Sequence, residues 1–225
     1  MRGSVRLLVF DWDGTLIDSI GHIVAAMQAA IRDAGLPPRS EREIRDIIGL
    51  GIREATARLF PGLDGPELRQ ALGSAYRRRY YAGGDDSQLL PGVAGALERL
   101  AESGYVLAVA TGKSRQGLDR ALARTGLGHR FRATRCADEG RSKPHPDMLE
   151  HLLGVTGTPA GAALMVGDSE HDLRMARSAG VGAVGVCSGA HGESVLRRCD
   201  PLVCLAGVGD LPAWLGRAGL GPAME

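Results

Sequence analysis

The sequence predicts an α/β fold, a doubly wound parallel sheet that is interrupted by an inserted helical domain, and three observations support it. Short apolar runs recur along the chain and suit strands that are buried on both faces. Helical patterns separate these runs, and strands that alternate with helices form parallel sheets with helices on both faces. Between residues 17 and 89 the strand pattern is absent, and amphipathic helical segments replace it.

Five segments carry the strand pattern. The first begins at Val5, ends at Phe10 and is followed directly by Asp11, and its continuous hydrophobicity indicates a central strand. Helices are expected between the strands, for example at 93–101 and 115–125. The other four strands are expected at residues 105–110, 163–166, 183–186 and 202–205.

The insertion is expected to hold four helices that are separated by glycine and proline breakers. A polar stretch at 82–88, followed by Leu90-Pro91-Gly92, marks the return to the sheet. We therefore assign residues 1–16 and 90–225 to a Rossmann-like core domain and residues 17–89 to a helical cap domain. The helices of the cap are expected at residues 19–34, 40–48, 52–59 and 66–81.

Composition and charge exclude several classes of protein. The 225 residues are enough for a core domain and an insertion, and 44% of them are hydrophobic. The formal net charge is +1 with acids and bases interspersed, so neither nucleic acid nor a membrane surface is expected as a partner. The run Arg77-Arg78-Arg79 is expected on a solvated helix face. No apolar stretch reaches about 20 residues, and a cytoplasmic monomer or homodimer is expected.

Two further residue types are informative. The four cysteines form no CxxC pair and have no zinc-ligand spacing, so we expect buried free thiols rather than a metal site or disulfides. Among 27 basic residues only two are lysines, Lys113 and Lys143, which suggests that each lysine has a specific role. The cysteines are Cys136, Cys187, Cys199 and Cys204.

Acidic residues follow the predicted strands at the edge where ligands bind in open parallel sheets. Asp11 and Asp13 come after the first strand, with Gly14 able to form a tight turn, and Asp168 and Asp172 follow the strand at 163–166. Converging carboxylates repel each other unless a hard divalent cation lies between them. Mg²⁺ is the expected cofactor, because it accepts a few carboxylates together with water and a phosphate.

The same edge carries groups that suit phosphoryl transfer. A carboxylate such as Asp11 can attack a phosphoryl group that is held in line and neutralised by a metal. Asp13 would then protonate the leaving alkoxide and later activate a water molecule. The Thr111 hydroxyl and the backbone N–H of Gly112 could hold a phosphate oxygen, and Lys143 supplies a compact positive charge.

These motifs resemble, in order and location, the four motifs of the haloacid dehalogenase superfamily. They are Asp11-x-Asp13-Gly14-Thr15, Thr111-Gly112, Lys143-Pro144 and Gly167-Asp168-Ser169-x-x-Asp172. The resemblance covers essentially the whole chain, since the insertion is similar to the small helical (C1-type) cap of that superfamily. The phosphoglycolate phosphatase and β-phosphoglucomutase branch is the most similar.

The resemblance implies roles for matching residues. Asp11 would be nucleophile and metal ligand, and Asp13 would be the acid/base with its backbone carbonyl on the metal. Asp168 would be a metal ligand, and Asp172 would support the metal shell through water or by orienting neighbours. The activity implied is magnesium-dependent hydrolysis of a small-molecule phosphate monoester, such as a phosphoglycolate-like compound or a sugar phosphate, through an aspartyl-phosphate.

Other functions remain open at this point. A phosphomutase of the β-phosphoglucomutase type would share Asp11 and Asp13. A non-catalytic phosphate-sensing module could use the same fold, although it would be free to lose both carboxylates. A dehalogenase is disfavoured because its chemistry does not need Asp13, and a phosphonatase because residues 17–89 hold no lysine for a Schiff base.

Further expectations concern residues around these motifs. Arg53 opens a predicted cap helix and is a candidate for substrate specificity. Lys113 is expected to point to solvent while its backbone N–H binds phosphate. Thr111 is also a candidate helix N-cap, and Asp18 and Ser19 are expected to cap the first cap helix. His145 and His171 are expected to form hydrogen bonds in a loop and a helix rather than to bind metal.

Overall fold

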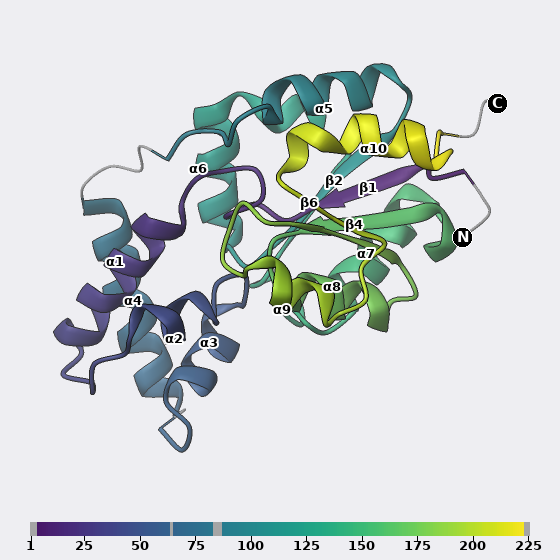
Figure 1. Cartoon of the computed structure of the whole chain (residues 1–225). Coiled ribbons are helices and arrows are strands. Elements are labelled where there is room, and N and C mark those ends of the chain that lie inside the picture. The colour runs from purple at the N-terminus through teal and green to yellow at the C-terminus, as the bar shows by residue number, and fades with distance from the viewer. Residues whose placement is uncertain (1–3, 64, 83–86, 223–225) are drawn as a thin grey trace.

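A computed structural model describes residues 4–63, 65–82 and 87–222 of the chain. Within these residues the sheet has six strands in the order β3-β2-β1-β4-β5-β6, and every neighbouring pair is parallel. Figure 1 shows helices on both faces of this sheet, so the doubly wound α/β class is confirmed. The strands are β1 (Leu7–Phe10), β2 (Val106–Thr111), β3 (Ala133–Cys136), β4 (Ala163–Gly167), β5 (Gly182–Val186) and β6 (Val203–Leu205).

The central strand β1 is fully buried because it pairs with β2 on one side and with β4 on the other. This explains its continuous apolar sequence. The five predicted strands are all present, with ends that shift by one or two residues. The strand β3 was not predicted. It lies at the edge of the sheet, and its residues Thr134 and Arg135 are only partly buried, so it lacks the apolar run that identifies the inner strands.

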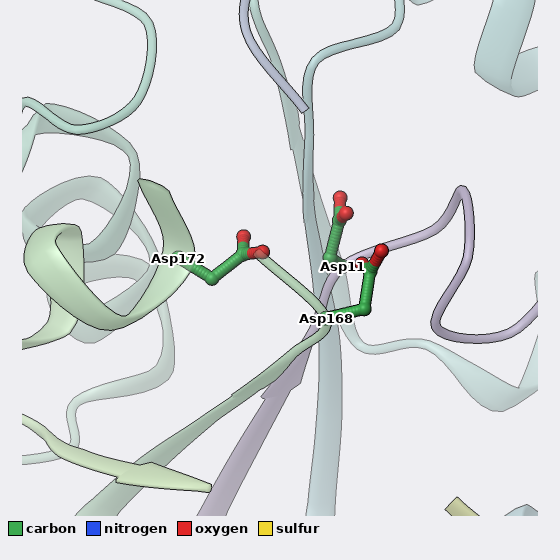
Figure 2. A group of neighbouring side chains, drawn as sticks. All are labelled: Asp11, Asp168 and Asp172. Carbon is green, nitrogen blue, oxygen red and sulfur yellow. The ribbon is translucent and has the colours of Figure 1, made fainter. Parts of the chain in front are cut away.

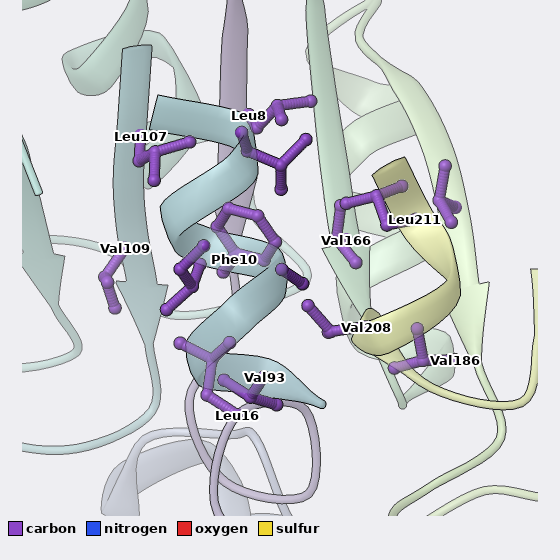
Figure 3. Close-up of a cluster of buried hydrophobic side chains, with 14 of the residues drawn as sticks. Leu8, Phe10, Leu16, Val93, Leu107, Val109, Val166, Val186, Val208 and Leu211 are labelled. Carbon is purple, nitrogen blue, oxygen red and sulfur yellow. The ribbon is translucent and has the colours of Figure 1, made fainter. Parts of the chain in front are cut away.

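Two layers of helices cover the sheet. Alternate residues of β1 face opposite layers, with Leu8 and Phe10 in one cluster and Leu7 and Val9 in the other. Figure 3 shows the first cluster, with Phe10 of β1 near its middle and Val93 among its other members. The core helices are α5 (Val93–Glu102), α6 (Arg115–Thr125), α7 (Asp147–Thr156), α8 (Glu170–Ser178), α9 (Glu193–Arg197) and α10 (Leu211–Ala218), with short 3-10 helices at Leu127–Arg130, Ala160–Ala162 and Val208–Asp210.

The insertion forms a separate group of helices at one end of the sheet (Figure 1). Its buried side chains make a cluster of their own, and its largest contact joins α1 to α4. The predicted helix at 40–48 is shorter than expected, because α2 ends at Arg45 and turns follow it. The cap helices are α1 (Ile20–Asp33), α2 (Glu41–Arg45), α3 (Ile52–Leu59) and α4 (Pro66–Ala82).

The connection between cap and core is a pair of adjacent chain segments. Ile17 forms an antiparallel bridge with Leu89 and a parallel bridge with Asp13. The chain therefore enters and leaves the cap at neighbouring points. Part of the predicted polar connection, at residues 83–86, lies outside the described residues. We propose that the cap spans residues 17–89 and that the core domain comprises residues 1–16 and 90–225.

Two surface expectations can be compared with the structure. Arg77, Arg78 and Arg79 are all exposed on α4, as predicted. None of the described helices is both long and apolar enough to cross a bilayer.

The expectation of buried thiols is wrong for three of the four cysteines. All four are free, but Cys187 is exposed and only Cys136 is buried, while Cys199 and Cys204 are partly buried.

Candidate active site

Three carboxylates meet at the carboxyl edge of the sheet (Figure 2). Asp11 follows β1, Asp168 follows β4, and Asp172 lies in the first turn of α8. Each of the three is at most 1% exposed. One oxygen from each lies within 4.8 Å of the others, so the neighbouring strands bring together residues far apart in the sequence.

Asp13 lies outside this group of three. After Asp11 the chain makes the tight turn expected at Gly14, where φ is 77°. The Asp13 carboxylate accepts a hydrogen bond of 2.7 Å from the Ser19 hydroxyl. Ser19 occupies the N-cap position of α1, but its side chain makes no capping bond, and Asp18 lies before it. Ser19 therefore lies at the predicted N-cap position, but its side chain does not cap the helix and its hydroxyl donates to Asp13 instead.

Lys143 joins two of the three clustered carboxylates. Its Nζ lies 2.6 Å from Oδ1 of Asp11 and 2.6 Å from Oδ1 of Asp172, and the side chain is completely buried. Burial acts to lower the pKa of Lys143, but the charges of Asp11 and Asp172 raise it above its ordinary value. Lys143 is therefore a permanently charged ammonium between the two carboxylates.

Lys113 is placed differently from the prediction. Its side chain is 11% exposed, and its Nζ lies 3.1 Å from Oδ1 of Asp13. The ammonium also donates to the Tyr80 hydroxyl at 3.2 Å and lies 4.8 Å from the centre of the Tyr80 ring. The expectation that this side chain points to solvent is wrong, because α4 of the cap packs over it. Both lysines of the chain therefore contact carboxylates of the site.

Thr111 and Gly112 end β2 beside these groups. Thr111 is buried, and its hydroxyl accepts from the backbone N–H of Lys113 at 3.2 Å. It is not the cap of α6, because Ser114 occupies that position and accepts from the N–H of Gly117. A Cβ atom at Gly112 would lie 2.5 Å from the carbonyl oxygen of Gly49, so the cap loop presses directly on this segment.

Asp168 is held by Thr15 and Ala190, and no role was predicted for either residue. The Thr15 hydroxyl donates to its Oδ1 at 2.8 Å, and the N–H of Ala190 donates to its Oδ2 at 2.6 Å. Burial, followed by the charge of Asp172, raises the pKa of Asp168 to about 7. The segment around Ala190 follows β5 at the same edge of the sheet. Its position after a strand at this edge was the only sequence feature that could have indicated a role for this segment, because it carries no recognisable motif.

Asp172 and the two histidines have structural partners. Asp172 accepts from the hydroxyl of Ser169 at 2.6 Å and from its N–H at 3.2 Å, which forms a capping box at the start of α8. His171 Nε2 bonds to the carbonyl of Asp46 at 2.9 Å, and His145 Nδ1 accepts from the N–H of Asp147. The prediction that His145 and His171 form hydrogen bonds in a loop and a helix is confirmed.

A cavity of about 750 Å³ lies between the cap and the core and reaches Asp13 and Lys143. Its walls come from the cap helices and from the loops that follow β2 and β3. Arg53 is among the lining residues, but its side chain is 82% exposed and lies 4.0 Å from Glu54. The substrate role of Arg53 stays a prediction. The cavity volume is typical of a small-molecule site.

Comparison with known proteins agrees with this arrangement. A family model described as haloacid dehalogenase-like hydrolase matches residues 8–186. The chain is 35% identical to "Probable phosphatase IndB" of Dickeya dadantii, over 88% of this chain and 87% of that protein. It is 34% identical to a phosphoglycolate phosphatase of Vibrio cholerae, over 85% of this chain and 89% of that protein.

A solved structure supports the same relationship. The crystal structure of a "predicted phosphoglycolate phosphatase" from Haemophilus somnus superposes with a TM-score of 0.79 at 27% identity, covering 95% of this chain and 99% of that one. The family match spans the end of β1, the cap and four of the strands behind it. The chain belongs to the haloacid dehalogenase-like hydrolases, in the branch that holds the phosphoglycolate phosphatases, and is a phosphoric monoester hydrolase.

Proposed function

We propose that this protein is a magnesium-dependent phosphatase that hydrolyses a small-molecule phosphate monoester through an aspartyl-phosphate on Asp11. The observation that carries the proposal is the state of the Asp11 carboxylate. Its Oδ1 is held by Lys143, while its Oδ2 is buried and has no hydrogen-bond partner among the described residues. An oriented carboxylate with one oxygen left uncommitted suits nucleophilic attack on phosphorus.

The proposed reaction has two steps. Asp11 Oδ2 attacks phosphorus, the bond from phosphorus to the leaving oxygen breaks, and Asp13 gives its proton to the departing alkoxide. Asp13 then takes a proton from water, and that water oxygen attacks phosphorus and releases phosphate and free Asp11. Lys143 stabilises charge on the nucleophile and on the phosphoryl oxygens, while Thr111 and the N–H of Gly112 bind the phosphate.

The charges around the site fit a divalent cation. Among the described residues, Lys113 and Lys143 form ion pairs with Asp11, Asp13 and Asp172, and Asp168 lies beside them. With all four carboxylates ionised, these six groups carry a net charge of −2. Burial, only partly offset by Lys143, raises the pKa of Asp11 well above its ordinary value. The donors are carboxylate oxygens, the ligands that Mg²⁺ prefers.

In this proposal the cation is held by Asp11, Asp168 and the backbone carbonyl of Asp13, and Asp172 orients Lys143 and the start of α8. When bound, Mg²⁺ supplies positive charge that makes phosphorus accessible to a carboxylate. The protein residues position the reacting groups and exclude water from them. A phosphoglycolate-like compound and a sugar phosphate both belong to the proposed substrate class. We also propose the cytoplasmic location that was expected from the sequence.

The test is turnover of p-nitrophenyl phosphate with and without Mg²⁺, for the native protein and for Asp11→Asn. The amide keeps the shape of the carboxylate and loses its charge and nucleophilicity, so turnover should fall to less than about 1% of native. Beryllium fluoride with Mg²⁺ should inhibit the native protein, because it mimics a phosphoryl group on a carboxylate. Residual activity of more than a few per cent in a folded Asp11→Asn protein would contradict the assignment.

A phosphomutase is the second candidate, since it would use the same carboxylates. A mutase passes the phosphoryl group from Asp11 to a second sugar phosphate instead of to water. It would therefore need a bisphosphate activator. Phosphate release from a monophosphate without any activator favours the phosphatase.

A further inference from the structure

The cavity beside Asp13 is the place where the leaving group of the substrate would lie, and this inference rests on the function proposed above. Asp13, the proposed proton donor to the leaving oxygen, lines the cavity together with Lys143. The volume of about 750 Å³ falls in the range of sites that enclose drug-sized ligands. A two-carbon acid such as glycolate would leave most of this space unfilled.

The walls of the cavity in the cap are mostly apolar. Ile23 and Met27 of α1 contribute from one helix, and Ile48, Leu50 and Ile52 contribute from the segment that leads into α3. Ile23, Met27 and Ile48 are each at most 6% exposed. Binding an apolar part of a substrate against these walls removes apolar surface from water, and this is favourable.

A row of tyrosines on α4 forms the aromatic part of the same cavity. Tyr76 and Tyr80 are one helical turn apart, with ring centres 5.7 Å apart and a tilt of 48°. Tyr81 packs edge-on against Tyr80 at 5.1 Å. Tyr80 is only 3% exposed, and Arg120 lies 4.7 Å from the centre of the Tyr81 ring. The partly exposed ring of Tyr76 is therefore the aromatic surface that a planar group could contact.

The cap supplies no buried cation to this cavity among the described residues. Arg53 is 82% exposed, and Arg77 is an exposed side chain that bonds to Ser74 at 3.3 Å. From the core, Lys113 is already bound to Asp13 and Tyr80. A carboxylate on the leaving group would lose its hydration without gaining a buried positive partner from the cap, and this is costly.

Tyr76 provides a polar group inside these walls. Its hydroxyl has no hydrogen-bond partner in the part of the chain that the structure describes, and the residue lines the cavity. Burial raises the pKa of this phenol, against the opposing effect of the nearby Lys113 ammonium. The hydroxyl therefore stays protonated and can donate one hydrogen bond to a ligand.

We propose that the leaving group is a bulky, uncharged group with a planar ring, which packs against Tyr76 on α4 and accepts a hydrogen bond from the Tyr76 hydroxyl. Glycolate has no ring and carries a negative charge, so this inference narrows the substrate class proposed above and makes a phosphoglycolate-like compound a poor substrate. Tyr76 would then be a specificity residue. It contacts the leaving group and affects which substrates bind, and it takes no part in the transfer of the phosphoryl group.

The experiment uses pairs of substrates whose leaving oxygens are chemically alike. Uridine 5′-monophosphate and ribose 5-phosphate share a primary alcohol on a ribose and differ in the planar heterocycle. Benzyl phosphate and 2-phosphoglycolate are both esters of primary alcohols and differ in ring and charge. The member with the ring should have a kcat/KM at least about tenfold higher in each pair, the range expected for stacking on aromatic side chains.

Variants then test Tyr76 itself. Tyr76→Phe should raise KM for uridine 5′-monophosphate by about fivefold, as for the loss of one hydrogen bond, with little change in kcat. The KM for ribose 5-phosphate should stay within about twofold. Tyr105→Phe is the matched control, because the Tyr105 hydroxyl donates to the carbonyl of Leu220 in the core, and it should leave both KM values unchanged.

Binding to the folded Asp11→Asn protein separates this inference from the proposed function. Calorimetric titration of that variant with benzyl phosphate and with 2-phosphoglycolate needs no turnover. Tighter binding of benzyl phosphate supports the inference even if the native protein hydrolyses neither p-nitrophenyl phosphate nor these two compounds, a result that would overturn the proposed function alone. Equal binding, or tighter binding of 2-phosphoglycolate, would overturn the inference, as would a Tyr76→Phe protein with native KM for both ribose esters.

Discussion

The ammonium group of Lys143 lies 2.6 Å from Asp11 and 2.6 Å from Asp172, so a single buried side chain ties the proposed nucleophile to the start of α8. Three donors radiate from one nitrogen, and two of them meet carboxylates. This arrangement favours a compact cation, because the Lys143 side chain is completely buried and its nitrogen contacts both carboxylates.

Lys143→Arg should therefore lower kcat/KM by at least about a hundredfold, since the planar guanidinium would displace its charge by roughly 1 Å. Steady-state kinetics with p-nitrophenyl phosphate would measure this, with circular dichroism to show that the fold persists. A well-folded Lys143→Arg protein with near-native kcat/KM would show that the role given to Lys143 is wrong.

Lys113→Met should lower kcat at least about tenfold, because it removes the ammonium group from the carboxylate of Asp13, the proposed acid and base. In the structure this ammonium group contacts Asp13 and does not point into solvent. Without the ion pair, the hydrogen bond from the Ser19 hydroxyl is the side-chain contact that Asp13 keeps among the described residues. The comparison is with Arg78→Met, which removes an exposed cation of α4 and should leave kcat unchanged. Equal kcat values for the two variants would contradict the prediction.

Gly189→Ala should disrupt the site, whereas Gly192→Ala in the same loop should not. A Cβ atom at Gly189 would lie 2.7 Å from Cβ of Asp168 and nearer still to its carboxylate, while a Cβ at Gly192 meets nothing within 4 Å. The expected loss of unfolding free energy is about 2 kcal/mol for Gly189→Ala and less than about 0.5 kcal/mol for Gly192→Ala. Chemical denaturation measures both, and similar values would count against the packing described around Asp168.

Mg²⁺ should raise the melting temperature of the native protein, because a cation relieves repulsion among Asp11, Asp168 and Asp172. At a hundredfold excess over its dissociation constant the gain is about 2.7 kcal/mol. For a chain of this length that corresponds to a shift of about 5 °C or more. Thermal scans with Mg²⁺ and with EDTA would show it, and Asp168→Asn should reduce the shift. An equal shift in Asp168→Asn would argue against this metal site.

Acid should weaken the fold through His171. Burial lowers the pKa of His171 to about 4, despite its bond to the Asp46 carbonyl, whereas in the unfolded chain it titrates near 6.5. The unfolded state then binds a proton that the folded state does not. This contribution to stability is complete above pH 6.5 and is lost as the pH falls toward 4.

The size of this effect is at most about 1.4 kcal/mol per pH unit. Unfolding free energies of the native protein and of His171→Asn, measured from pH 7 to pH 4.5, should converge as the pH falls. The exposed His129 provides the comparison, since His129→Asn should keep the native pH dependence. Parallel curves for native and His171→Asn proteins would refute the prediction.

The sequence predicted most of the fold because buried central strands are recognisable on their own. β1 is apolar throughout, and the carboxylates directly after it and after β4 could be placed at one edge of the sheet. The strand β3 could not be found in this way, because an edge strand needs no continuous apolar run. Its Thr134 and Arg135 are tolerated where one side of the strand is open.

The side-chain partners in the site were harder to predict because they depend on contacts between distant segments. The direction of Lys113 is set by Tyr80, and a lysine in a loop gives no sign of which helix will cover it. Ser19 had the position of a helix cap, yet the turn at Gly14 brings Asp13 within reach of its hydroxyl. Tertiary packing decided both cases, whereas local preference favoured the wrong answer.

The contact between Gly112 and the cap loop offers a way to control access to the cavity. A single methyl group at this position would collide with the carbonyl oxygens of Gly49 and Leu50, at 2.5 and 2.8 Å. Gly112→Ala would thus act as a spacer that keeps the cap loop away from the end of β2 without altering a charged residue. Crystals of that variant would give a route to soaking bulky phosphate esters into an opened cavity.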